Sequence, residues 1–303
     1  MHDLRLHIRF RILLYLFAGI VFSALPSHAF AFDVTVVKTA ELKPYQDALR
    51  GFKETCNCEV REIKPDDEDI AKAVLRKSPE AVVAIGTGAF RNIKSVTGLP
   101  VIYTMVMPSE AALSKQPNVF GVSMDISPQT FLFTIRDVFP ASKRIGLLYD
   151  PSHTGVFVAE AMNVARAAGL ELVSRQVTDP RLIPAILDEM RGKIDVFWML
   201  PDATVAAPET VDYLLRFSFQ NNVPIFSFSR KYVEMGAVAA LDVDPYDMGA
   251  QAGQLIKKLK AGQPIPNREW ARASHLAINA KVAEKMGLQI SAEMIKKAGK
   301  HDR

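Results

Sequence analysis

The sequence predicts an α/β protein with two doubly wound, parallel-sheet lobes. Short strand-like runs alternate with amphipathic helical stretches in two consecutive series, which is the pattern of βαβ units. Near-continuous apolar runs such as residues 81–85 are typical of parallel strands covered by helices on both faces. A chain of 303 residues also exceeds what one hydrophobic core usually supports, so two lobes are expected.

The first series is predicted from the spacing of apolar residues. Strands are expected at 34–38, 59–63, 81–85 and 101–106, with helices at 44–54, 67–76 and 89–96. The pattern restarts after residues 118–123. A fold of this kind leaves the carboxyl ends of the strands facing a crevice, where ligands bind.

The second series continues the alternation to residue 242. Helices are expected at 128–139, 156–168, 180–190 and 208–221, with strands at 144–149, 171–176, 196–200, 225–227 and 237–242. A helix at 247–261 then ends at Gly262 and Pro264, and a strand at 274–278 precedes two short helical turns.

The first 31 residues are predicted to be a cleaved secretory signal peptide. Arg5, Arg9 and Arg11 precede an apolar run from residue 12 to residue 25, which is shorter than the ~20 residues that cross a bilayer. Small residues offer cleavage near Ala29 or Ala31. An uncleaved membrane anchor is the alternative. No cysteine follows the run, so a soluble periplasmic product is expected rather than a lipid-anchored one.

The charge balance argues against nucleic acid as a partner. The full chain carries a formal net charge of +4, and removal of the signal peptide, with three arginines and one aspartate, lowers it to +2. Nucleic-acid-binding domains concentrate far more positive charge on one face. The 49% of hydrophobic residues is ordinary for a globular protein, and no later segment is long and apolar enough to span a membrane. A monomer is expected.

The two cysteines, Cys56 and Cys58, lie two positions apart. An exported protein meets an oxidising compartment, which favours a local disulfide between them. A free pair would instead be a thiol or metal site, but C-x-C alone is a weak metal motif and no histidine lies nearby in the sequence.

Motifs of catalysis are missing from the sequence. Beyond the signal peptide only His153, His275 and His301 remain, without the i, i+4 spacing of a helical zinc site, and there is no G-x-S-x-G, H-E-x-x-H or P-loop. Gly86-Thr87-Gly88 follows a strand and opens a helix, but Arg91 stands at the third glycine position of a dinucleotide loop. This turn is expected to present N–H groups and a hydroxyl to an anionic ligand group. No cofactor and no metal are expected.

Residues at strand ends supply the candidate ligand contacts. They are Thr87, Gly88, Tyr103, Thr104, Tyr149, Asp202, Thr204 and Ser227. Hinges between the lobes are expected in the connecting segments, at Gly121, Val122, Asp242 and Val243.

Several of these candidates have a structural alternative. Asp150 begins a turn and helix-start sequence, so capping is favoured over function. Asp202 follows an apolar strand and suits a ligand amine as well as a structural role. Tyr103 and Tyr149 could cover an apolar or planar ligand, although alternation along the strand could bury Tyr103 in its own core.

Several segments together resemble one known family, the periplasmic substrate-binding components of ABC importers with the type I fold. The likeness covers almost the whole mature chain. It is carried by NVFGVS at 118–123, IGLLYDP at 145–151, VPIFS at 223–227, GAVAALDVDP at 236–245 with Gly249, Gln251 and Ala252, and LAIN at 276–279 with Ala283, Gly287, Leu288 and Ile290.

The resemblance implies two lobes joined by three crossovers. The first lobe would comprise residues 32–121 and 244–264, and the second residues 122–243 and 265–303. It also implies a small-molecule ligand in the interlobe cleft and an ABC permease and ATPase as partners. The resemblance also implies amino acids, aromatic ones among them, as ligands of some members, which would suit Thr87 and Thr104 near a carboxylate and Asp202 near an amine. The chain departs from the family at residues 105–108, where an acidic turn is common, and at 56–58, where relatives tend to have a longer connection.

The resulting hypothesis is reversible capture of a small molecule, such as an amino acid or a related organic solute, by lobe closure and without catalysis. One alternative is a periplasmic receptor subunit that senses a ligand, which the same fold would serve. The other is a periplasmic enzyme that uses Asp150 and Asp202.

Overall fold

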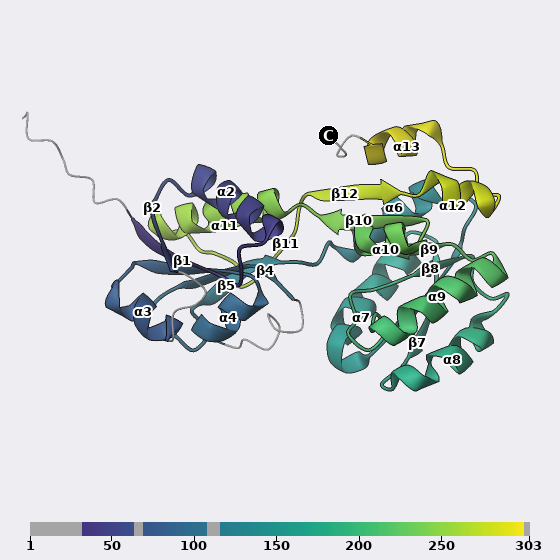
Figure 1. The fold of residues 1–303 in the computed structure, drawn as a ribbon, viewed down its shortest axis with the longest axis horizontal. Helices are drawn as coiled ribbons and strands as arrows, with labels where there is room; N and C mark the ends of the chain where they lie inside the picture. Colours follow the sequence, from purple (N-terminus) through teal and green to yellow (C-terminus); the bar gives the residue numbers. More distant parts are fainter. Residues whose placement is uncertain (1–31, 64–68, 108–115, 300–303) are drawn as a thin grey trace, which may run out of the picture. The chain divides into compact units, whose positions relative to one another are not determined.

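The computed structural model describes residues 32–63, 69–107 and 116–299, so the predicted signal peptide lies outside the described part of the chain. It contains two six-stranded sheets (Figure 1). The strand order is β11-β5-β4-β3-β1-β2 in the first sheet and β12-β10-β9-β8-β6-β7 in the second. Neighbouring strands are parallel except for β10 and β12. The predicted fold class is therefore confirmed.

The elements of the first sheet follow the predicted series closely. They are β1 (Asp33–Lys38), α2 (Lys43–Cys56), β2 (Glu59–Ile63), α3 (Ile70–Arg76), β3 (Ala81–Ile85), α4 (Thr87–Ile93), β4 (Val101–Val106) and β5 (Val119–Ser123), together with α11 (Pro245–Lys260) and β11 (Glu269–Trp270) from later in the chain.

The second sheet repeats the same alternation. Its elements are α6 (Pro128–Val138), β6 (Arg144–Tyr149), α7 (Pro151–Ala167), β7 (Glu171–Gln176), the 3-10 turn η1 (Pro180–Leu182), α8 (Ile183–Met190), β8 (Val196–Trp198), α9 (Pro208–Asn221), β9 (Ile225–Ser227), α10 (Arg230–Met235), β10 (Ala239–Val243), β12 (Ser274–Ile278), α12 (Ala280–Lys285) and α13 (Ala292–Ala298). The sequence analysis did not predict α10 or β11, which are only six and two residues long.

Local sequence explains where the helices begin. The Asp150, Ser127 and Asp244 side chains each accept a hydrogen bond from a backbone N–H of the first turn of α7, α6 and α11. A proline follows each of these caps, at a position where the missing N–H costs nothing. Asp150 is thus a helix cap, as favoured from the sequence.

Helix α11 returns to the first sheet, where it packs beside α2 on the face opposite α3 and α4 (Figure 1). Glycines allow this close approach, because a Cβ atom at Gly249 would lie 1.8 Å from the backbone oxygen of Ala48, and one at Gly51 would lie 2.0 Å from that of Tyr246. The helix that follows Asp244 thus packs against α2 of the first sheet.

Each sheet has its own apolar core. On the first sheet, side chains from β3 and β4 pack with Phe90 and Ile93 of α4. On the second, Phe197 and Met199 pack with residues of α8 and α9 such as Leu187 and Leu214. Two separate cores are what the length of the chain predicted.

The chain crosses between the sheets three times, but two expected boundaries need correction. Gly121 and Val122 lie inside β5, paired with β4 and β11, so the first crossover begins only after Ser123. Glu269 pairs with Val122, so residues 265–270 belong with the first sheet and the third crossover follows Trp270. The two-residue pairing of β11 has no periodicity that a sequence can reveal.

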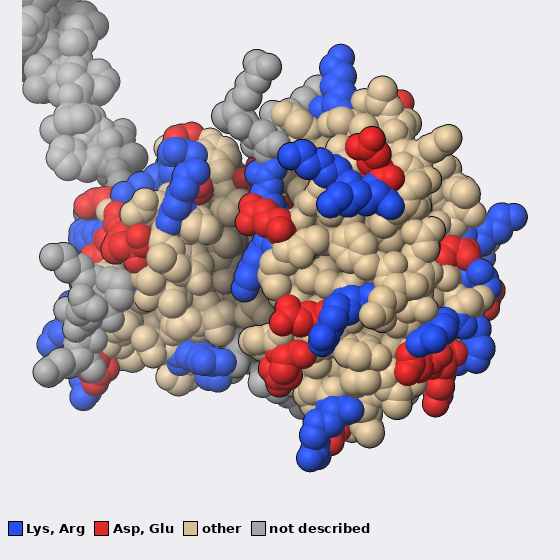
Figure 2. Space-filling model, turned by 45° about the vertical axis from the view of Figure 1, so that its right-hand side comes forward, with Lys and Arg blue, Asp and Glu red and all other residues tan. Residues whose placement is uncertain are grey.

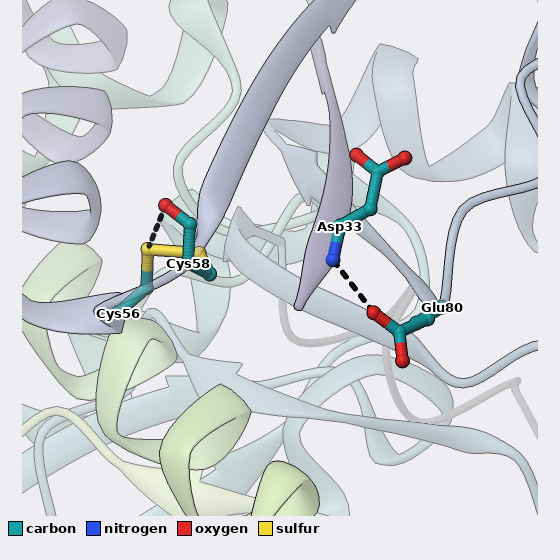
Figure 3. Close-up of a disulfide and its surroundings, with 4 residues drawn as sticks. All are labelled: Asp33, Cys56, Cys58 and Glu80. Carbon is teal, nitrogen blue, oxygen red and sulfur yellow. Dashed lines mark hydrogen bonds between the residues drawn. A yellow bond between two sulfur atoms is a disulfide. The ribbon is translucent and has the colours of Figure 1, made fainter. Parts of the chain in front are cut away.

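Cys56 and Cys58 form a disulfide at the end of α2 (Figure 3). Asn57 between them adopts a left-handed conformation with φ of 50°, which ends the helix and turns the chain into β2. Nearby, the Glu80 carboxylate accepts a hydrogen bond of 2.8 Å from the N–H of Asp33, at the start of β1 (Figure 3). Neither feature lies at the carboxyl ends of the strands.

Candidate functional site

The side chain of Thr39, directly after β1, packs against the turn at Gly86-Thr87-Gly88. The Thr39 hydroxyl accepts a hydrogen bond of 2.9 Å from the N–H of Ala89, and a Cβ atom at Gly86, where φ is 97°, would lie 2.4 Å from that hydroxyl. The Thr87 hydroxyl accepts from the N–H of Met107 at 3.0 Å. Thr39 thus takes up one of the helix N–H groups that were expected to face a ligand.

Tyr103 belongs to the core of its own sheet, the alternative that alternation left open. Its side chain is 2% exposed and its ring centroid lies 5.4 Å from that of Phe90. Burial raises the pKa of the Tyr103 phenol to about 12. A Cβ atom at Gly121 would lie 2.4 Å from the Tyr103 ring, which explains why a glycine stands there in β5. Thr104 is wholly buried beside it.

Asp150 and Asp202 belong to one hydrogen-bond network at the ends of β6 and β8. Asp202 is fully buried, and its carboxylate accepts from the N–H of Asp150 at 2.8 Å and from the Thr154 hydroxyl at 2.6 Å. It also accepts from the N–H groups of Thr204 at 3.0 Å and Val205 at 3.3 Å. Four donors from its own lobe hold the Asp202 carboxylate.

The Asp150 carboxylate likewise accepts hydrogen bonds from its own lobe. Its carboxylate accepts from the hydroxyl and the N–H of Ser152, at 2.7 and 2.9 Å, and from the Thr204 hydroxyl at 2.9 Å. The hydrogen bonds from Ser152, above all that from its hydroxyl, hold the pKa of the Asp150 carboxyl below its usual value. His153 Nδ1 lies 3.7 Å from each of the two aspartates. The network therefore organises the loops of the second lobe.

The remaining two candidates also have partners within the second lobe. The Tyr149 hydroxyl accepts a hydrogen bond of 3.1 Å from the Gln176 amide. The Ser227 hydroxyl is buried and donates to the backbone oxygen of Ser229 at 3.0 Å. The structure thus places the predicted residues at the strand ends but does not gather them around one cavity.

Two neighbouring cavities lie where the strands of both sheets end. The larger has a volume of about 400 Å³ and the smaller about 130 Å³. They share four wall residues, which are Met124, Ser229, Asp242 and Val243. Two of these, Asp242 and Val243, were predicted as hinge residues, and they are the last two residues of strand β10, directly before the second crossover.

The smaller cavity combines carboxylates with an apolar wall. Asp125 and Asp242 line it together with the rings of Phe131, Phe157 and Phe228. Phe157 packs against three aromatic rings, with centroids 5.7 Å from Trp198, 6.2 Å from Trp270 and 6.5 Å from Phe131. Such a wall suits a ligand with a flat apolar part and a positively charged group.

The larger cavity has a different charge pattern. Arg230, Asp242 and His275 line it together with apolar residues from both sheets. The Asp242 carboxylate accepts from the Ser229 hydroxyl and the Arg230 N–H, both at 3.1 Å. His275 Nε2 lies 3.1 Å from the Asp244 carboxylate, across the second crossover.

Sequence reasoning missed Asp125, Phe157 and Ser229 as cavity residues. A signal existed for two of them, because Asp125 and Ser229 each lie two positions after a strand, β5 and β9, as the candidate Thr87 lies two positions after β3. Phe157 lies seven positions into α7, beyond the strand-end positions that the prediction considered.

Within residues 32–63, 69–107 and 116–299, no group of three or more histidine, cysteine or acidic residues is arranged to hold a metal ion. In the same residues, no helix is long and apolar enough to cross a membrane. Basic and acidic side chains alternate over the face shown in Figure 2, without a broad field of one sign.

The chain was compared with known families and proteins. Residues 47–302 match the family described as ABC transporter substrate binding protein. A tyrosine-binding protein from Clostridioides difficile is 24% identical over 242 residues, which cover 75% of this chain and 69% of that protein. The family resemblance found in the sequence is confirmed by these matches.

Solved structures share the fold. A substrate-binding protein with adhesive properties from Clostridium difficile, in a ligand-free, open form, has a TM-score of 0.68 at 19% identity, covering 86% of this chain and 96% of that one. An ABC domain from Streptococcus pneumoniae in complex with L-Trp has a TM-score of 0.57 at 23% identity, covering 88% and 99%.

Proposed function

Since the chain belongs to the family of ABC transporter substrate-binding proteins, we propose that it captures an amino acid with an apolar, preferably aromatic, side chain and delivers it to an importer. The family consists of binding proteins that work with an ABC transporter rather than of enzymes. No catalytic role is therefore assigned to Asp150 or Asp202, whose contacts stabilise their own lobe.

One observation carries the choice of ligand class. The two cavities at the strand ends share Asp242, and the smaller one sets Asp125 and Asp242 against three phenylalanine rings. Buried carboxylates attract an ammonium group, and aromatic walls favour an apolar or aromatic side chain. Two relatives support this choice, one named for tyrosine binding and one solved with L-Trp.

The proposed cycle is reversible closure of the two lobes over the ligand. The cavity walls come from both sheets and from the crossovers between them, so a bound ligand would contact both lobes at once. A ligand that binds the closed state more tightly shifts the population towards it. We further propose export to the periplasm with removal of the leader near Ala29 or Ala31, and docking of the closed form on a permease with its ATPase.

The test is calorimetric titration with L-tyrosine, L-tryptophan and L-phenylalanine, compared with 3-phenylpropionate, which lacks the amine. We expect saturable binding of at least one amino acid and none of the deaminated analogue. Asp242→Asn is expected to weaken binding by about tenfold or more, because a charged hydrogen-bond acceptor is lost.

The control variant is Asp179→Asn, which removes a carboxylate paired with Arg181 on the surface and away from both cavities. It should bind as the wild type does. Equal binding of the amino acids and 3-phenylpropionate, no binding of any of them, or chemical conversion of a bound amino acid would contradict the proposal.

A further inference from the structure

Asp125 is a buried carboxylate on the wall of the smaller cavity. It follows β5 at the first crossover, and its residue is only 7% exposed. Its backbone oxygen accepts a hydrogen bond of 3.1 Å from the N–H of Ala271, in the third crossover. The carboxylate is therefore held at a fixed place between two crossovers.

Four groups face or flank this carboxylate. The Ser123 hydroxyl donates to it at 3.0 Å, and Arg268 Nη2 lies 3.0 Å from the same oxygen, Oδ2. The Tyr103 phenol lies close enough on β4 to interact with its charge, and Asp242 shares the cavity wall from β10. Burial raises the pKa of Asp125 to about 6, although Arg268 and Ser123 each act to lower it.

Arg268 can leave Asp125 at little cost. Its side chain is 36% exposed, and its guanidinium carbon lies 4.1 Å from the centre of the Trp270 ring. A long cationic side chain with access to water can turn its charged head to solvent while its apolar stem stays against the protein, which changes the contact of the guanidinium with the Trp270 ring. Asp125 has no such freedom, since an unpaired buried carboxylate is strongly disfavoured.

We propose that Asp125 is a ligand-binding carboxylate that exchanges Arg268 for the ammonium group of the ligand, so that capture of the ligand and a proton on Asp125 exclude one another. This inference rests on the proposed function, because it requires a ligand with an amine. It adds to that function the residue that binds the amine, Asp125, a cation of the protein that competes with the ligand, Arg268, and a dependence of ligand affinity on pH.

The direction in which ligand affinity changes with pH follows from the charge of Asp125. A protonated Asp125 is neutral and does not attract an ammonium group, so acid competes with the ligand. The ammonium of a free amino acid stays charged between about pH 5 and pH 7.5. With a pKa of about 6 for Asp125, affinity should be level near pH 7.5 and fall by about tenfold by pH 5.

The experiment is titration with L-tryptophan, L-tyrosine and L-phenylalanine at several pH values in this range. The wild type should show the tenfold loss, whereas Asp125→Asn should bind more weakly at pH 7.5 and lose no further affinity at pH 5. Arg268→Gln should move the midpoint of the pH dependence upwards, because the Arg268 charge lowers the pKa of Asp125. Arg268→Lys should move it back towards that of the wild type.

A second arginine–aspartate pair, between Arg272 of the third crossover and Asp247 of α11, supplies the controls. Arg272 Nη2 lies 2.7 Å from Asp247 Oδ1, and neither residue lines a cavity. Arg272→Gln and Asp247→Asn should leave the pH dependence of the wild type unchanged. A flat affinity profile of the wild type, or a wild-type slope in Asp125→Asn, would overturn the inference.

A measurement without ligand separates this inference from the proposed function. Trp198 and Trp270 are the two tryptophans of the chain, so Trp198→Phe leaves Trp270, beneath Arg268, as the reporter. Its fluorescence should change near pH 6 and lose that change in Asp125→Asn; wild-type emission gives the same readout if Trp198→Phe does not fold. No binding of any amino acid would refute the proposed function and, with it, the role of Asp125 in binding an amine, whereas normal binding with no Asp125-dependent change in fluorescence would refute the exchange alone.

Discussion

At the scale of single residues, Asp202 and Asp242 show how similar positions acquire different roles. Asp202 follows β8 by four positions, and Asp242 is the last residue but one of β10. Asp202 is surrounded by four donors and is fully buried. Asp242 lies on the wall of both cavities. The neighbouring donors, not the strand-end position, decide which carboxylate faces a cavity.

Asp202→Asn should lower the free energy of unfolding by about 2–4 kcal/mol. The variant keeps the shape of the side chain but turns an amide NH₂ towards groups that donate hydrogen bonds, which leaves buried N–H groups unsatisfied. Urea denaturation monitored by circular dichroism measures the change.

Asp188→Asn is the matched control for this substitution. Asp188 is 53% exposed and pairs with Arg191 at the end of α8, so the change in stability should stay within about 0.5 kcal/mol. If Asp202→Asn kept wild-type stability and lost only ligand affinity, Asp202 would be a ligand contact instead.

At the scale of secondary-structure elements, the pairing of α2 with α11 joins segments about 200 positions apart. The helices approach so closely that backbone meets backbone at Gly51 and Gly249. This contact attaches the helix that follows the second crossover to the first sheet. It therefore fixes one end of that crossover in place.

Gly249→Ala should destabilise the protein by about 3 kcal/mol or more, because the new methyl group would lie 1.8 Å from a backbone oxygen that cannot turn aside. Gly155→Ala in α7 is the control. Its nearest neighbour would lie 3.7 Å away, so the higher helix propensity of alanine should stabilise the protein by about 0.5–1 kcal/mol. Thermal unfolding of both variants checks the pair, and equal melting temperatures would contradict the close-packing argument.

At the scale of the whole molecule, the three crossovers are tied to one another. The N–H of Ala271 donates to Asp125, and the N–H of Asp244 donates to the oxygen of Ala273 at 3.3 Å. Gln251 of α11 holds the third crossover on both sides, through the oxygen of Trp270 and the N–H of Arg272, each at 3.1 Å. A change in one crossover should therefore be transmitted to the others.

If the lobes close over the ligand, a bound amino acid should both compact and stabilise the protein. Small-angle scattering should record a smaller radius of gyration with saturating ligand. At a ligand concentration of about 100 times Kd, the stabilisation should reach about 2.7 kcal/mol, visible as a higher melting temperature.

Asp242→Asn at the same ligand concentration is the comparison, because it should show less of both effects. A rise in melting temperature with an unchanged radius of gyration would mean that the ligand binds without closure.

Much of the fold could be predicted from the sequence by itself. The alternation of buried strands with amphipathic helices determined both sheets, since a strand with both faces covered has to be apolar along its whole length. The expected start of α6 at Pro128 was right, whereas α7 and α11 begin at Pro151 and Pro245, earlier than the expected residues 156 and 247. The family resemblance followed from segments spread over both lobes.

Only the tertiary structure decided which strand-end residues line a cavity. The rule that ligands bind at strand ends selected Tyr103 and Asp202. Phe90 and Gly121 enclose Tyr103, and donors from the start of α7 and from residues 204–205 enclose Asp202. The same rule missed Asp125 and Phe157 on the cavity wall. Arg268, just before β11, contacts Asp125, and Trp270 of β11 contacts Phe157 of α7, so both places depend on segments distant in sequence. The spacing of apolar residues indicates which face of a helix or strand is buried. A binding site depends instead on which hydrogen-bond donors, distant in sequence, lie next to a side chain, and only the folded chain brings them together.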